Sequence, residues 1–240
     1  MANPMEQFVI KPIIPIEVGG VDISFTNSSL FMVLAVLLST LILGICLRKR
    51  SLVPNMAQSV PESLYEFIEG LLKENVGAEG LKYFPFIFTV FLFVAFGNVL
   101  GLFPYAFTFT SHLTAVGSLS LLALALNIFV GIKRKKLGWI RTFLPKGIPA
   151  VMAPVIIPIE IVSFLSKPFS LSMRLVANMT VGHIMLKIIA SFVVALGIFG
   201  VVPLLFDCAI VCFEIFISLL QAFIYTVLSC IYLGEAIHEH

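Results

Sequence analysis

Long apolar runs alternate with short polar segments along most of this chain. The runs cover residues 30–47, 84–107, 113–132, 149–190 and 200–233. An α-helix needs about 20 apolar residues to cross the hydrocarbon core of a bilayer. The pattern therefore predicts one all-α polytopic membrane domain over residues 1–240, with about five transmembrane helices.

The last two runs are longer than one upright crossing requires. They are separated by a break near residues 197–203, which include two glycines and a proline. Each run is either a single long helix that is strongly tilted in the membrane or a pair of shorter spans. We expect the first arrangement.

A different pattern occupies residues 60–76. Apolar residues recur there at helical spacing, with Glu62, Glu66, Glu69 and Lys73 between them, which predicts an amphipathic helix on the cytoplasmic face. Residues 59–62, with the sequence SVPE, are typical of a capping box at its start. The apolar stripe of this helix either lies at the membrane interface or contacts another subunit.

Composition supports the membrane assignment, and charge gives an orientation. The chain is 60% hydrophobic and 12% charged, with a mean hydropathy of +1.09, whereas soluble domains average about 25% charged residues. Basic clusters at 48–50 and 133–136 end the first and third runs, and the positive-inside rule places both in the cytoplasm. The N-terminus is then outside and the C-terminus inside. A net charge of +2 gives no reason to expect a nucleic-acid partner.

Several other classes of site and signal are not indicated. Residues 1–10 lack the basic and apolar regions of a signal peptide. The spacing of Cys46, Cys208, Cys212 and Cys230 does not suit a zinc site, so we interpret them as packing residues. No phosphate-binding loop or nucleophile elbow is recognisable. We therefore expect no cofactor, no metal and no enzymatic activity of the chain by itself.

Arg174 is the residue that most needs an explanation. It lies inside the fourth apolar run, where an arginine costs from about 3 to more than 10 kcal/mol. Its guanidinium stays protonated, so it is a permanent positive charge that cannot itself carry a proton. Such a residue is suited to repelling cations or to holding a carboxylate.

Polar residues form one stripe on each of the last two predicted helices. At about 100° per residue, Glu160, Lys167, Arg174 and Asn178 lie within about 40° of one another, and His183 points about 180° away from Arg174. The stripe on the last helix contains Asp207, Glu214, Gln221 and Tyr225, with Ser218 beside it. Polar stripes on apolar helices indicate hydrated grooves. An arginine between two incomplete aqueous paths would block direct passage, and His183 and Glu214 are natural proton-relay groups.

Structural roles are alternatives for several of these residues. Glu160 and Lys167 can form an interfacial ion pair, and Asn178 and Gln221 can hydrogen-bond between helices. Asp207 can lie at the outer interface. The hydroxyls of a serine group can bond to their own helix backbone. These serines are Ser163, Ser166 and Ser170.

Three segments together resemble the a subunits of F-type ATP synthases. They are SFLSKPFSLSMRLVANM at 163–179, NVLGLFP at 98–104 and QAFIY at 221–225. Their order and spacing, and the pattern of spans, match that family over nearly the whole chain.

The resemblance implies a non-catalytic, proton-translocating stator subunit with two half-channels that serve carboxylates on a rotating ring of c subunits. Arg174 matches the arginine that separates the half-channels, with Asn178 and Gln221 near it. His183 and Glu214 match the outer half-channel pair, in the order found in mitochondrial and related bacterial members. Glu160 and Ser163 match positions near the inner half-channel.

The implied partners are the c-subunit ring, the b-subunit stalk, the remaining ATP synthase subunits and the lipid bilayer. The implied location is a bacterial inner membrane, with the mitochondrial inner membrane as the alternative, and the coupling ion favoured is H⁺ over Na⁺. A secondary transporter in which Arg174 binds an anionic substrate would be expected to contain an internal repeat, and none is visible. A structural scaffold without an ion path is the third interpretation.

Overall fold

The computed structural model describes residues 8–18, 21–22, 24–48, 54–103, 106–135 and 152–237. Several residues used in the sequence analysis lie outside these ranges. They are Lys49, Arg50, Pro104 and Lys136.

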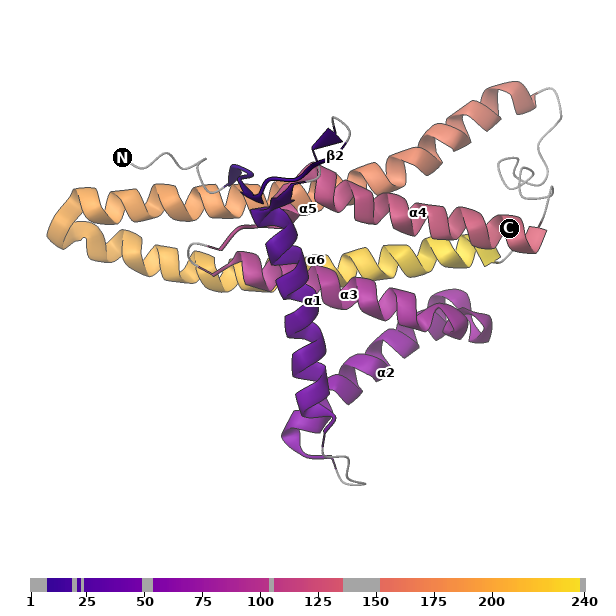
Figure 1. Cartoon of the computed structure of the whole chain (residues 1–240), viewed down its shortest axis with the longest axis horizontal. Helices are drawn as coiled ribbons and strands as arrows, with labels where there is room; N and C mark the ends of the chain where they lie inside the picture. The colour runs from indigo at the N-terminus through magenta and orange to yellow at the C-terminus, as the bar shows by residue number, and fades with distance from the viewer. Residues whose placement is uncertain are drawn as a thin grey trace.

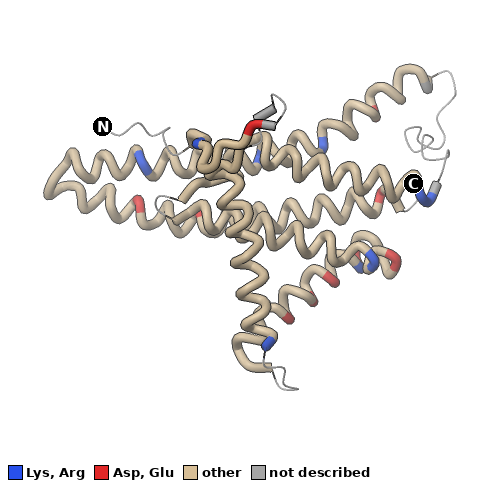
Figure 2. The backbone as a smooth tube through the Cα atoms, viewed as in Figure 1, with Lys and Arg blue, Asp and Glu red and all other residues tan. Residues whose placement is uncertain are grey.

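Five long apolar helices make up the body of the molecule. They are α1 (Asn27–Cys46), α3 (Phe84–Gly101), α4 (Leu113–Lys135), α5 (Ala153–Leu196) and α6 (Val201–Ile237). Among the described residues, four apolar stretches are long enough to cross a membrane, and the last, 154–237, contains both α5 and α6. Figure 2 shows α1 and α3 without charged residues, whereas acidic and basic residues lie along α2. The prediction of an all-α polytopic membrane protein is confirmed.

The two longest helices form an antiparallel hairpin. A short 3-10 turn, η6 (Gly197–Gly200), joins α5 to α6 at the predicted break. Figure 1 shows the pair running side by side, with α1 crossing their direction and the first part of α5 diverging from the rest. Pro158 and Pro168 lie inside α5, and a proline bends a helix because it removes a hydrogen bond and crowds the preceding turn.

The central helix is α6, which packs against α2, α3, α4 and α5. Its buried residues Ala222, Tyr225 and Leu233 belong to the main core, together with residues of the other helices. These four helices surround α6, so its polar stripe lies in the middle of the packed bundle.

The amphipathic helix α2 (Met56–Val76) packs within the chain. Ile68, Leu72 and Val76 of its apolar stripe are fully buried in the core shared with α3 and α6. The chain itself therefore covers this part of the stripe, whereas Phe67 remains 42% exposed. Its start also differs from the predicted capping box, because the carbonyl of Asn55 accepts hydrogen bonds from the N–H groups of Gln58 and Ser59, at 2.8 and 2.9 Å, and the helix begins before Ser59.

Two features near the start of α1 and the end of α3 were not predicted. The apolar run to residue 107 is helical only to Gly101, and the chain then passes through residues 106–108 to the 3-10 turn η3 (Phe109–Ser111). Before α1, β1 (Pro12–Ile14) pairs with β4 (Phe25–Thr26) and β2 (Glu17–Val18) pairs with β3 (Val21–Asp22), both antiparallel. Such short ladders have too few residues for a recognisable alternation.

A close approach of α2 to α6 gives a prediction about folding. A Cβ atom at Gly234 would collide with the backbone carbonyl oxygen of Asn75, whereas one at Gly117 in α4 would meet nothing within 4 Å. We expect Gly234→Ala to destabilise the protein by about 1–3 kcal/mol through overpacking, and Gly117→Ala to preserve its stability. Thermal unfolding of the detergent-solubilised complex measures both, and equal transition temperatures for the two variants would contradict the prediction.

Candidate functional site

Polar side chains gather where α6 meets its neighbours, inside an otherwise apolar body. The buried polar residues of α3–α6 and of the segment before η3 are Asn98, Thr108, Ser120, Asn127, Ser172, His183, Glu214, Ser218, Gln221, Thr226 and Ser229. We refer to this set as the polar seam. Buried polar groups are costly without partners, so their concentration along one helix interface indicates a functional region.

His183 lies at one end of the polar seam and is 9% exposed. Its Nε2 is 3.1 Å from the hydroxyl of Thr108, and that hydroxyl donates to the carbonyl of Gly101 at 3.2 Å. The ring of Phe8 meets the imidazole edge-on, with centroids 6.3 Å apart. Residues from the segment after α3 and from the N-terminal region therefore contact one ionisable ring.

Glu214 lies beside the same stretch of α5. It is 5% exposed, and its carboxylate packs so closely against Gly182 that an added Cβ there would collide with it. Within the described part of the chain, neither carboxylate oxygen has a hydrogen-bond partner. An acidic group with unmet hydrogen-bonding capacity thus lies against the α5 backbone, one residue before His183.

The middle of the hairpin contains an amide pair and Arg174. Asn178 donates from Nδ2 to Oε1 of Gln221 at 3.2 Å, which confirms the interhelical hydrogen bond that the sequence left open. Arg174, one turn earlier on α5, is exposed. No described residue forms an ion pair with it, so its counter-charge is not supplied by the part of the chain that the structure describes.

The far end of the hairpin contains an ion pair that the sequence analysis did not predict. Lys167 binds Oε2 of Glu235 at 2.6 Å, and its ammonium lies 4.7 Å from the ring centroid of Tyr232. Lys167 is therefore paired across the hairpin with Glu235. Glu160 is half-buried nearer the start of α5, and Ser163 is exposed, with its carbonyl accepting from the Ser166 hydroxyl at 2.7 Å.

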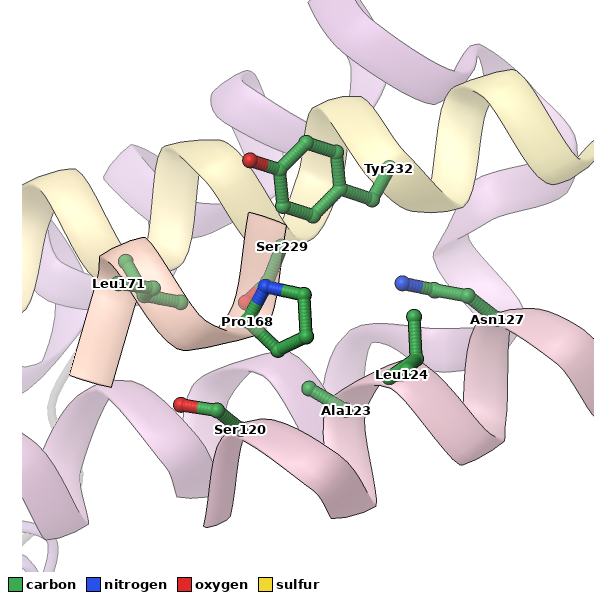
Figure 3. A pocket seen from close by; sticks show the side chains of 8 residues that line it. All are labelled: Ser120, Ala123, Leu124, Asn127, Pro168, Leu171, Ser229 and Tyr232. Carbon is green, nitrogen blue, oxygen red and sulfur yellow. The ribbon is translucent and has the colours of Figure 1, made fainter. Parts of the chain in front are cut away.

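Helix α4 adds a hydroxyl network and a small cavity. Ser120 accepts hydrogen bonds from Ser172 and Tyr225, at 2.9 and 3.3 Å. Beside it, Figure 3 shows the side chains of α4, α5 and α6 around a cavity, among them Asn127 and Tyr232. The cavity has about 10 Å³ of space for the centre of a water molecule, enough for about one water.

The predicted stripes correspond to two different faces. On α6, Glu214, Ser218, Gln221 and Tyr225 are all buried, whereas Asp207 is half-buried near the turn of the hairpin. On α5, the stripe through Arg174 is exposed or half-exposed and His183 is buried on the opposite side. The arginine and the histidine therefore face different surroundings although they lie on one helix.

Only one cysteine has the packing role expected of all four. Cys230 is buried in the core, whereas Cys208 and Cys212 are exposed on α6 and Cys46 is half-buried. Their apolar sequence context could not separate a packed position from one on the outer surface of a membrane helix.

Comparison with known proteins gives a consistent result. The family model described as "ATP synthase A chain" matches residues 29–234. ATP synthase subunit a of Paramagnetospirillum magneticum is 52% identical over 247 residues, and that of Rhodospirillum rubrum is 49% identical over 241 residues, both covering 100% of each chain. The corresponding Brucella ovis protein is 47% identical over 246 residues, with 99% of each chain covered. The chain therefore belongs to the ATP synthase A chain family.

Proposed function

We propose that Arg174 separates two half-channels in this chain, which its family membership makes the non-catalytic, proton-translocating stator subunit of an F-type ATP synthase. The observation that carries the proposal is the contrast along α5. An exposed permanent cation without an ion-pair partner among the described residues lies on one face, and a buried histidine lies on the other.

Arg174 acts as the barrier. A fixed positive charge in a low-dielectric region repels hydrated cations. A guanidinium also has five N–H groups that can donate hydrogen bonds to a carboxylate. Carboxylates of a passing c-subunit ring supply the missing counter-charge one at a time. Asn178 and Gln221 form a hydrogen bond between α5 and α6 one turn away from Arg174. This bond fixes the position of the arginine relative to α6.

His183 and Glu214 are the proton carriers of the outer half-channel. Imidazole exchanges protons near neutral pH, and the carboxylate of Glu214, whose oxygens have no hydrogen-bond partner among the described residues, is free to accept one. Both belong to the polar seam, and Glu214 lies against the residue that precedes His183. A proton can therefore pass between them over a short path.

Glu160 and Ser163 line the inner half-channel in this proposal. Both lie between the start of α5 and Lys167, on the side of Arg174 away from His183. Because Glu160 and Ser163 precede Arg174 on α5 and His183 follows it, the inner and outer aqueous paths end on opposite sides of Arg174.

Helix length supports a steep tilt. With 44 residues in α5 and 37 in α6, the helices are about 66 and 55 Å long at about 1.5 Å per residue. Both exceed a hydrocarbon core of about 30 Å, and α1, which has 20 residues, crosses their direction in Figure 1. We place α1 upright and the hairpin strongly inclined, wrapped around the ring.

Orientation and partners follow from charge and family. The basic residues after α1 and at the end of α4 lie in the cytoplasm by the positive-inside rule, with the N-terminus outside and the C-terminus inside. The bacterial origin of the relatives supports the bacterial inner membrane as the location of this multi-pass protein. Its partners are the c-subunit ring, the b-subunit stalk and the other subunits of the complex, and the coupling ion is H⁺.

A test of the outer half-channel uses His183→Gln, which keeps a polar side chain but cannot exchange protons. We expect ATP-driven proton uptake by inverted vesicles containing the whole complex to fall about a hundredfold, as for loss of an acid–base group. Ser191→Ala, an exposed position on the same helix, is the matched control and should pump normally. Unchanged pumping by assembled His183→Gln would favour the scaffold interpretation, and solute uptake by the chain alone would favour a transporter.

A further inference from the structure

Thr108 lies where three parts of the outer end meet. It is 1% exposed, and its single hydroxyl is within hydrogen-bonding distance of the Gly101 carbonyl at 3.2 Å and of Nε2 of His183 at 3.1 Å. A hydroxyl has one proton to donate and two lone pairs to accept with. The two contacts therefore cannot both be donated by Thr108.

The structure at the end of α3 indicates which of the two contacts receives the proton of the Thr108 hydroxyl. Gly101 is the last residue of α3, so its carbonyl is one of those that no helical N–H group can reach. It is also buried, and a buried carbonyl without a donor is costly. The Thr108 proton is accordingly given to Gly101, and the oxygen of Thr108 is left to accept from His183.

We infer that Thr108 is a positioning residue that fixes the tautomer of His183, with the proton of the neutral ring on Nε2. The opposite nitrogen, Nδ1, is then the only ring atom at which the neutral histidine can take up a proton. A histidine used as a relay needs one defined exchange site, since a ring that alternates between tautomers presents its lone pair in two directions. The inference rests on the proposed relay role of His183.

The surroundings of His183 make Thr108 the decisive partner. Among the described residues, Thr108 is the one side chain hydrogen-bonded to the imidazole. The described ionisable groups of this region are Lys187 on the same helix, Glu214 on α6, Asp207 beside Glu214, and His112 beside Phe8. The ring of Phe8 closes another side without offering a hydrogen-bond acceptor to the edge of the imidazole. None of these groups replaces the threonine oxygen at Nε2.

The experiment compares Thr108→Val, which removes the hydroxyl at similar volume, with Thr108→Ser, which keeps it. Proton uptake by vesicles containing the whole complex is measured as a function of pH. Without the hydroxyl, we expect maximal flux to fall about tenfold and the midpoint of the acid limb to move down by about one pH unit, because the hydrogen bond favours the protonated ring. Thr108→Ser should retain the flux and midpoint of the wild-type chain.

Further variants distinguish the possible outcomes. Thr108→Ala, which cannot clash, should reproduce the pH shift of Thr108→Val. The inference is overturned if the hydroxyl-free variants keep the wild-type pH profile, if Thr108→Ser loses as much flux as Thr108→Val, or if neither hydroxyl-free variant assembles, which would assign the hydroxyl to folding alone. If His183→Gln pumps normally, the relay role itself fails. If His183→Gln is inactive and Thr108→Val resembles wild type, only the inference about the tautomer fails.

Discussion

Replacing Arg174 with alanine is expected to reduce the rate of ATP-driven proton pumping at least about a hundredfold. The complex should still assemble. Loss of one partner from a desolvated charge pair costs about 3–5 kcal/mol, and about 1.4 kcal/mol corresponds to a factor of ten. Arg174 is exposed and has no ion-pair partner among the described residues. Its removal should therefore affect the ring carboxylate and the barrier without disturbing the fold of this chain.

Two variants sharpen the test of Arg174. Arg174→Lys keeps the charge but loses the planar fork of donors, so we expect pumping to lie between the alanine variant and wild type. Met173→Ala alters a neighbouring side chain that is 43% exposed and should leave pumping intact. Normal pumping by Arg174→Ala, measured with a pH-sensitive dye in inverted vesicles, is the result that would remove the arginine from the mechanism.

Replacing Glu214 with glutamine is expected to reduce proton pumping about a hundredfold while leaving stability unchanged or higher. The amide has nearly the shape of the carboxyl group, so it retains the packing against Gly182, but it cannot take up and release a proton. Burying a carboxylate without hydrogen-bond partners is costly, and both oxygens lack partners within the described residues. Activity should therefore fall without a loss of stability.

Glu214→Asp provides the matched control, because it keeps a titratable carboxyl group on a shorter side chain. We expect it to pump at a measurable fraction of the wild-type rate. Vesicle acidification and the thermal unfolding of the purified complex are measured on the same preparations. A glutamine variant that pumps like wild type would show that the carboxyl group does not carry protons.

The sequence was most informative where a property depends on one helix alone. Periodicity placed the apolar helices and the stripe of Glu214, Gln221 and Tyr225, because these follow from residue spacing. The opposite directions of Arg174 and His183 also followed from helical geometry, and the structure has one exposed and the other buried.

Contacts between distant segments could not be predicted in this way. Thr108 meets His183 across 75 residues, and Lys167 meets Glu235 across 68. No local pattern marks either partner, since their pairing depends on how α3 ends and on the register of the hairpin. The stripe of α2 shows the same limit, because amphipathicity indicates a buried face but not whether lipid, another subunit or the chain itself covers it.

The length of the α5–α6 hairpin determines where along it the transmembrane electrical potential changes most steeply. Arg174 and His183 are about 13 Å apart along α5 at about 1.5 Å per residue. On an inclined helix, much of that separation lies in the plane of the membrane rather than across it. In the proposed arrangement, water in the two half-channels would carry each side's potential inward, so the drop, about 2.3 kcal/mol per charge for each 100 mV, would fall across the short dry stretch around the arginine. The field there would be directed largely sideways, and its force on a ring carboxylate would act as a torque.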